Sequence, residues 1–180
     1  MKEEIINYKL ADFLKQDPEL IDEYRVLLTH IKSIQTKKEI FYMKFKHVEL
    51  IKENLQSGEV EDIVEIISKV QKIGKDDIYN MDILTFYGLL NSVKEQIKTI
   101  NDAEITALTS NQTNFRWEAV GGSEKMKQFG TYTTLDMISN GDITKWDTIM
   151  NIDYADIFTK LYMNRVKDDL QAEMEQMKTK

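Results

Sequence analysis

The longest regular pattern in the sequence lies at residues 82–100, which read DILTFYGLLNSVKEQIKTI. Its apolar residues recur at spacings of three and four, as they do along one face of an α-helix. The average spacing of about 3.5 residues also lets two helices pack along a continuous seam. We predict a long core helix of a bundle, which explains the pattern more economically than an intermolecular coiled coil. The positions predicted to be buried are Ile83, Phe86, Tyr87, Leu90, Val93, Ile97, Ile100, Ile105 and Leu108.

Start and stop signals predict further helices before this one. Asp17 is a suitable N-cap, and Pro18 after it has no N–H to lose in the first helical turn. A helix at about residues 47–56 should end at Gly58, and the next helix should end at Gly74. The sequence therefore predicts several helices packed against the long one.

The C-terminal part also reads as helical. Short helices are predicted at residues 134–140 and around Trp146, and a long helix should begin after Asp153. We predict a fold that is all-α or nearly so, namely a single-domain helical bundle. The exception is a short strand or extended arm near residues 39–46, where β-branched and aromatic residues gather.

The sequence contains no linker between two independent cores, and no repeat of fixed period is apparent. We predict one helical domain at residues 1–167, followed by a charged helical tail at residues 168–180. A polar and glycine-bounded stretch near residues 109–132 interrupts the helical pattern and is predicted to be a flexible loop.

Three aromatic residues are the candidates for binding a partner protein. Phe115 and Trp117 stand in the polar stretch, outside any helical periodicity, and Trp146 lies in a short helix nearby. Tryptophan is enriched among residues that dominate binding energy. The alternative is that these rings fold back to cover the bundle.

Composition excludes several kinds of chemistry. The 180 residues include no cysteine, which rules out disulfides, thiolate catalysis and Cys-based zinc sites and favours a reducing cytoplasm. The two histidines, His30 and His47, have no second histidine at helical spacing, so no metal site is predicted. No apolar run approaches the roughly 20 residues of a membrane span, and the first residues do not read as a secretory signal. We therefore expect a soluble protein.

No catalytic motif is present either. The sequence lacks a GxSxG turn, a GxxxxGK[ST] or GxGxxG phosphate loop, and the spaced oxygen ligands of an EF-hand. We predict a non-enzyme with no cofactor and no small-molecule substrate. A carboxylate pair that only folding brings together is the one catalytic arrangement that the sequence leaves open.

Charge favours partners other than nucleic acid. The net charge of −7 opposes sequence-independent binding to phosphates. A local basic stretch is the exception, and acidic residues follow it directly. It contains Arg25, Lys32, Lys37, Lys38, Lys44, Lys46 and Lys52. The stretch is read either as a solvated helix face or as a surface that orients a partner.

The order of these features resembles small helical morphogenesis proteins of tailed bacteriophages, notably tail-assembly chaperones. The likeness runs over residues 40–165 and rests on Ser57-Gly58-Glu59, Phe86-Tyr87, Lys94-Glu95-Gln96-Ile97 and the segment GDITKWDTIMNIDY at residues 141–154. Asp153 stands where that family usually has proline. The resemblance implies a non-catalytic protein that binds other phage structural proteins, and itself, in the host cytoplasm during assembly, or that stays in the virion. The alternative is an acidic helical regulator whose basic stretch contacts nucleic acid.

Overall fold

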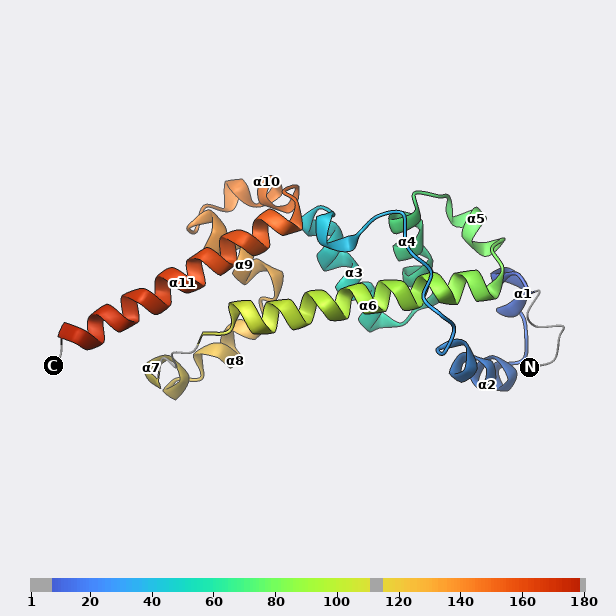
Figure 1. Ribbon diagram of the computed structural model, residues 1–180, viewed down its shortest axis with the longest axis horizontal. Coiled ribbons are helices and arrows are strands. Elements are labelled where there is room, and N and C mark those ends of the chain that lie inside the picture. The colour runs from blue at the N-terminus through green and yellow to red at the C-terminus, as the bar shows by residue number, and fades with distance from the viewer. Residues whose placement is uncertain (1–7, 111–114, 179–180) are drawn as a thin grey trace. The chain divides into compact units, whose positions relative to one another are not determined.

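The computed structural model describes residues 8–110 and 115–178 of the chain (Figure 1). These residues form eleven α-helices and two short 3-10 helices, and no strand occurs within these two ranges. The prediction of a nearly all-α fold is confirmed. The chain divides into two compact units: unit 1 is Met1–Ile40 with Leu50–Thr99, and unit 2 is Phe41–Glu49 with Ile100–Lys180. The prediction of one domain stays a prediction, because compactness alone does not establish independent folding.

Unit 1 contains the helices of the N-terminal half. They are α1 (Leu10–Phe13), α2 (Pro18–Leu28), α4 (Val60–Gln71), α5 (Lys75–Tyr79), and parts of α3 (Phe45–Ser57) and α6 (Ile83–Leu108). Helix α2 begins as predicted, with the Asp17 carboxylate accepting a hydrogen bond from the backbone N–H of Glu19 at 2.9 Å. Helix α4 instead ends at Gln71, and Lys72 after it adopts a left-handed conformation with φ of 54°. The predicted stop at Gly74 is wrong, because Gly74 is the N-cap of α5.

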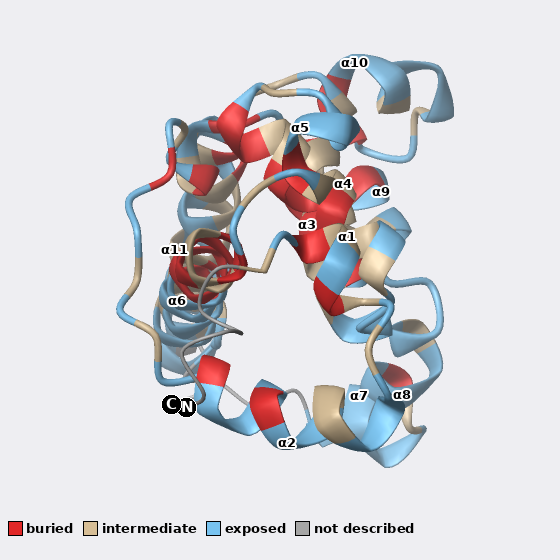
Figure 2. Cartoon of the chain, turned by 90° about the vertical axis from the view of Figure 1, so that its right-hand side faces the viewer, coloured by how far each residue is buried: buried red, intermediate tan, exposed pale blue. Residues whose placement is uncertain are grey.

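Helix α6 carries the buried face that its sequence predicts. Ile83, Phe86, Leu90 and Val93 are buried, and so are Ile97 and Ile100 further along. Buried residues of α4 belong to the same unit and appear red in Figure 2. The stripe ends sooner than expected, because Ile105 is exposed. Burying these aliphatic and aromatic groups supplies the main driving force for folding, at roughly 25 cal/mol per Å² of apolar surface.

The segment at residues 29–40 is irregular, but it is tied along α6 by hydrogen bonds. The Asn91 amide donates to the backbone carbonyl of Ile31 at 2.8 Å, and the Gln96 carbonyl accepts from the N–H of Ile40 at 2.8 Å. Gly88 permits the close approach, since an added Cβ would lie 2.7 Å from the Ile34 side chain. The buried polar groups of α6 therefore serve to hold this connection.

Unit 2 contains the helices of the C-terminal half. They are α7 (Phe115–Ala119), α8 (Gly122–Lys127), α9 (Thr131–Ser139), α10 (Trp146–Met150) and α11 (Tyr154–Lys178), with the 3-10 helix η3 (Ile143–Lys145) between α9 and α10. The prediction of a flexible loop at residues 109–132 is wrong wherever the structure describes that stretch beyond Ser110, because α7, α8 and the start of α9 occupy most of it. Residues 111–114 lie outside the described residues.

The predicted strand or arm near residues 39–46 is largely replaced by other structure. Residues Ile40–Tyr42 form the 3-10 helix η2, and α3 begins at Phe45. Only Lys44 has a strand-like partner, in a single antiparallel bridge with Asp153. Among the side chains that gave the strand-like pattern, Met43 and Phe45 are buried, whereas Tyr42 is exposed.

That bridge belongs to an element that the structure uses twice, which we call the brace. In brace 1, the N–H of Leu10 donates to the carbonyl of Met81, and the N–H of Ile83 donates to the carbonyl of Tyr8, both at 2.9 Å. The bridge joins Lys9 and Asp82 in antiparallel fashion. Each of the two bridged residues is followed directly by a helix, α1 after Lys9 and α6 after Asp82.

Brace 2 repeats this pattern in unit 2. The N–H of Phe45 donates to the carbonyl of Ile152 at 2.9 Å, and the N–H of Tyr154 donates to the carbonyl of Met43 at 2.8 Å. The helices that begin here are α3 and α11. The local sequences also match, since residues 76–83 read DDIYNMDI and residues 147–154 read DTIMNIDY. We call the segments around Lys9 and Lys44 the arms, and the segments around Asp82 and Asp153 the receiving segments. The two arms are separated by fewer residues than the two receiving segments, so the duplicated element has no fixed period and the prediction from the sequence missed it.

Candidate partner-binding surface

Helices α7 and α8 bury little of themselves within the described structure. Phe115 is 80 % exposed and Trp117 is 45 % exposed. In Figure 2 both α7 and α8 are mostly pale blue, which marks exposed residues. Monomeric proteins seldom expose large contiguous apolar areas unless the area binds something. The exposed apolar residues from α7 to η3 define what we call the α7–α9 surface. They are Phe115, Trp117, Val120, Phe129, Tyr132, Met137 and Ile143.

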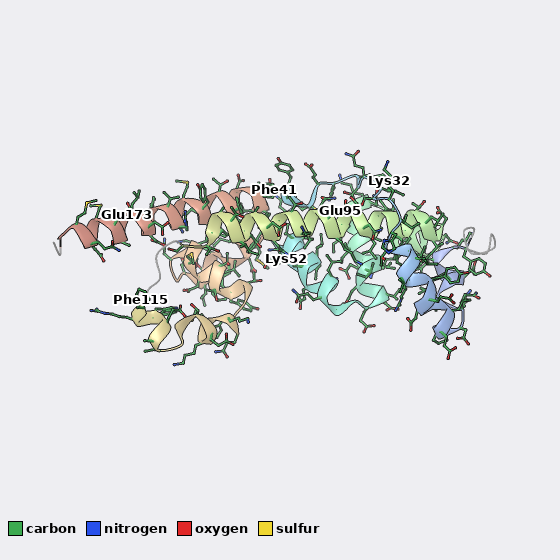
Figure 3. All side chains as sticks on the ribbon, turned by 60° about the horizontal axis from the view of Figure 1, so that its bottom comes forward. Lys32, Phe41, Lys52, Glu95, Phe115 and Glu173 are labelled. Atoms are coloured by element: carbon green, nitrogen blue, oxygen red, sulfur yellow. The ribbon has the colours of Figure 1, made fainter. Side chains whose placement is uncertain are left out.

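Phe115 and Trp117 share α7 but have different surroundings. Residues two apart on a helix do not share a face. The indole of Trp117 lies over Gly122 at the start of α8, so closely that an added Cβ on Gly122 would be 2.2 Å from the ring. Phe115, labelled in Figure 3, is the more exposed of the two. In the α7–α9 surface, the Trp117 ring thus packs against Gly122, whereas the Phe115 ring faces solvent.

Trp146 belongs to a separate cluster at the start of α10. Its indole N–H donates to the Ser139 hydroxyl at 3.3 Å, and its ring lies 5.4 Å from the ring of Tyr132. Trp146 is half-buried, whereas Tyr132 is exposed. Two of the three predicted residues, Phe115 and Trp117, therefore lie on α7. The third, Trp146, contacts the α7–α9 surface through Tyr132. A partner-binding role for all three stays a prediction.

Sequence reasoning missed most of the α7–α9 surface. Phe129 and Tyr132 flank Gly130 in the same polar stretch that drew attention to Phe115, so their position was an available signal. Met137 and Ile143 gave no such signal, because each stands in a stretch with ordinary helical spacing. Their exposure depends on which face of α9 and η3 packs inward, and one sequence alone does not determine this.

A buried polar group of unit 2 is the phenol of Tyr154 at the start of α11. It donates a hydrogen bond to Glu104 at 2.5 Å. Burial raises the pKa of this phenol above its usual value, and the hydrogen bond to Glu104 and the charges of Glu104 and Glu49 raise it further. The ring packs edge-on against Phe41, with centroids 5.5 Å apart. A phenol that stays protonated and surrounded by aromatic rings is suited to stabilising the fold.

The rest of the described chain offers few groups for other chemistry. Across residues 8–110 and 115–178, no cluster of three or more His, Asp or Glu side chains could hold a metal ion. Within the same ranges, no helix has both the length and the apolarity to cross a membrane.

The basic stretch predicted from the sequence is divided between the two units. Lys44 and Lys46 belong to unit 2, whereas the other five members belong to unit 1. Lys44 forms a 2.9 Å ion pair with Asp153, and Lys46 donates to the Asn151 amide oxygen at 2.6 Å. These two lysines are therefore used in brace 2 and its neighbourhood, which weakens the interpretation as a nucleic-acid site.

No family model, no curated protein and no solved structure matches the chain.

Proposed function

We propose that this chain is a non-catalytic protein–protein interaction component of a tailed-phage particle, acting in tail or head–tail assembly as a chaperone or virion subunit. The observation that carries the proposal is the exposed α7–α9 surface, which comprises seven exposed large apolar side chains within residues 115–143. Exposed rings such as Phe115 and Trp117 offer large contact areas at a low cost in side-chain entropy.

The phage setting rests on the sequence resemblance alone, above all on residues 141–154. In the structure this segment contains α10 and Asp153, the bridge residue of brace 2, so it belongs to the framework beside the α7–α9 surface. The proposed partners are other structural proteins of the particle, met in the host cytoplasm. Mass spectrometry of purified virions tests whether the protein remains in the particle or leaves as a chaperone would.

The binding role is tested by the double substitution Phe115→Ala and Trp117→Ala. We expect the variant to lose capture of the particle protein that the wild type binds, because rings at the centre of an interface supply most of its binding energy. Thermal stability should fall by less than the roughly 3–5 kcal/mol expected for a buried aromatic residue, since Phe115 is 80 % exposed and Trp117 is 45 % exposed, and only the contact of Trp117 with Gly122 is lost. Val26→Ala is the matched control, because Val26 is an exposed apolar residue of α2 in unit 1.

Two results would contradict the proposal. A stability loss of roughly 3–5 kcal/mol, as expected for a buried aromatic residue, would show that the rings cover the core. Unchanged stability together with unchanged capture would leave the α7–α9 surface without a role. Retained capture by the Val26→Ala control is required for either comparison.

A further inference from the structure

A groove in unit 1 is apolar at its base and cationic at its edge. It is lined by residues of α1, α2, α3, α4 and α6 and has a volume of about 250 Å³. Its base is formed by Leu10, Phe13, Phe86 and Leu90, all of which are buried. Arg25 and Lys94 are the charged residues of its lining, and no acidic side chain contributes to it. In a chain with a net charge of −7, a lining with two cations and no acid favours an acidic occupant.

The two cations are available for such an occupant. Phe86, Leu90 and Lys94 are spaced four residues apart on α6, so they follow one face of the helix from the groove base to its mouth. Lys94 forms no ion pair with any residue that the structure describes. Arg25 lines the groove and forms a 3.6 Å pair with exposed Asp22, which leaves other guanidinium donors free.

The size of the groove favours side chains over a whole small molecule. Sites for small molecules usually measure about 300–1,000 Å³ and bury most of the ligand. A groove of about 250 Å³ is instead suited to a few apolar side chains presented by a helix, which usually inserts residues at i, i+4 and i+7. The occupant should therefore be an amphipathic helix with acidic residues beside its apolar face.

The chain itself contains such a helix near the end of α11. Leu170, Met174 and Met177 are spaced at i, i+4 and i+7, and they are 54 %, 60 % and 75 % exposed. Residues 168–177 carry four acidic residues and no basic one. Glu173, labelled in Figure 3, lies on this stretch and has no ion-pair partner among the described residues. Methionine side chains are flexible enough to fill an irregular groove.

We propose that the acidic end of α11 from one copy docks into the unit 1 groove of a second copy. Leu170, Met174 and Met177 would enter the groove, and Glu173 would lie near Lys94. Such a contact joins two different surfaces, so it is head-to-tail and builds rings or filaments. The inference goes beyond the proposed function, whose surface is α7–α9, and either can fail while the other holds.

Complementation between two full-length variants tests this contact. Lys94→Glu blocks the groove edge, and Leu170→Glu blocks the helix. Both positions are exposed, so we expect both variants to melt like the wild type. In sedimentation velocity the wild type should self-associate, and each variant alone should associate about tenfold more weakly. Mixing the two should restore a heterodimer that grows no further, because only one intact groove and one intact helix remain.

Controls separate this contact from other modes of association. Lys37→Glu makes the same charge change at an exposed lysine of unit 1 outside the groove, and it should associate like the wild type. The double variant Lys94→Glu with Glu173→Lys should regain association if the two charges meet. A wild type that stays monomeric at all concentrations overturns the proposal. Pairing of two α11 helices would abolish association in Leu170→Glu without rescue by the groove variant, and that result also overturns it.

Discussion

Replacing Tyr154 by Phe removes one hydroxyl from the interior of unit 2 and keeps the ring. The phenol donates to Glu104 at 2.5 Å, and Tyr154 is 2 % exposed, so water does not enter the space that the hydroxyl leaves. A hydrogen bond to a charged group contributes roughly 1.5–3 kcal/mol. Because Glu104 itself is half-buried and recovers some hydration, we expect a loss of about 1–2 kcal/mol in the free energy of unfolding at pH 7.

The same substitution should change how stability depends on alkaline pH. The folded-state pKa of Tyr154 is raised, first by burial and then by Glu104, whereas an unfolded tyrosine ionises near about pH 10. The stabilising difference is therefore complete below about pH 10 and is lost as the pH rises further, since only the unfolded chain releases the proton. This one group lowers the unfolding free energy by up to about 1.4 kcal/mol per pH unit. Tyr154→Phe should lack that contribution.

Urea denaturation between pH 7 and pH 11 measures both effects. The control is Tyr42→Phe, because Tyr42 is an exposed tyrosine of the same unit and should leave stability and its pH dependence unchanged. A loss below about 0.5 kcal/mol at pH 7 would show that the bond to Glu104 contributes little. Equal slopes for wild type and Tyr154→Phe above about pH 10 would refute the burial argument.

Two other perturbations test the packing. Leu90→Ala should cost about 2–5 kcal/mol, because Leu90 is buried in the face of α6 and truncation leaves a cavity; a loss below about 0.5 kcal/mol in a denaturation series would mean that this face is not the core. Truncation after Leu170 should leave the melting temperature nearly unchanged, whereas truncation after Lys167 should lower it. The longer deletion removes Asp169, which pairs with Arg165 at 3.1 Å and accepts from Ser110 at 2.7 Å. Equal melting temperatures for the two truncations would show that Asp169 does not hold α11.

The sequence predicted those parts of the fold in which local chemistry and periodicity agree. Asp17 and Pro18 mark the start of α2, and the apolar stripe of α6 identifies the buried face of unit 1. The end of α4 was missed because Lys72, not Gly74, takes the left-handed conformation there. Glycine adopts that conformation without strain, so the sequence favoured the wrong residue. The observed end is held by Ser68, whose hydroxyl donates to the carbonyl of Ile73 at 2.7 Å and whose carbonyl accepts from the N–H of Lys72.

The candidate surface was predictable only in part. Phe115 and Trp117 stand out because they interrupt a polar stretch, but that same polarity concealed α7 and α8. Both helices are short, and helices of this length gain most of their stability from packing. Trp117 over Gly122 is such a contact, and it joins residues whose pairing no periodicity indicates. The burial of Trp146 likewise depends on Tyr132 and Ser139, which belong to a different helix.

The duplicated brace carries a consequence for the order of folding. Lys44 must pair with Asp153, 109 residues further along, although the similar receiving segment at Asp82 is only 38 residues away. Loop closure alone favours the non-native pairing of Lys44 with Asp82 over the native pairing with Asp153 by about 0.9 kcal/mol. A chain that emerges from the ribosome also completes the segment around Asp82 well before the one around Asp153. We expect the arms around Lys9 and Lys44 to compete for the receiving segment around Asp82. Folding should be slow until the Lys9 arm has paired with that segment and α11 has been synthesised.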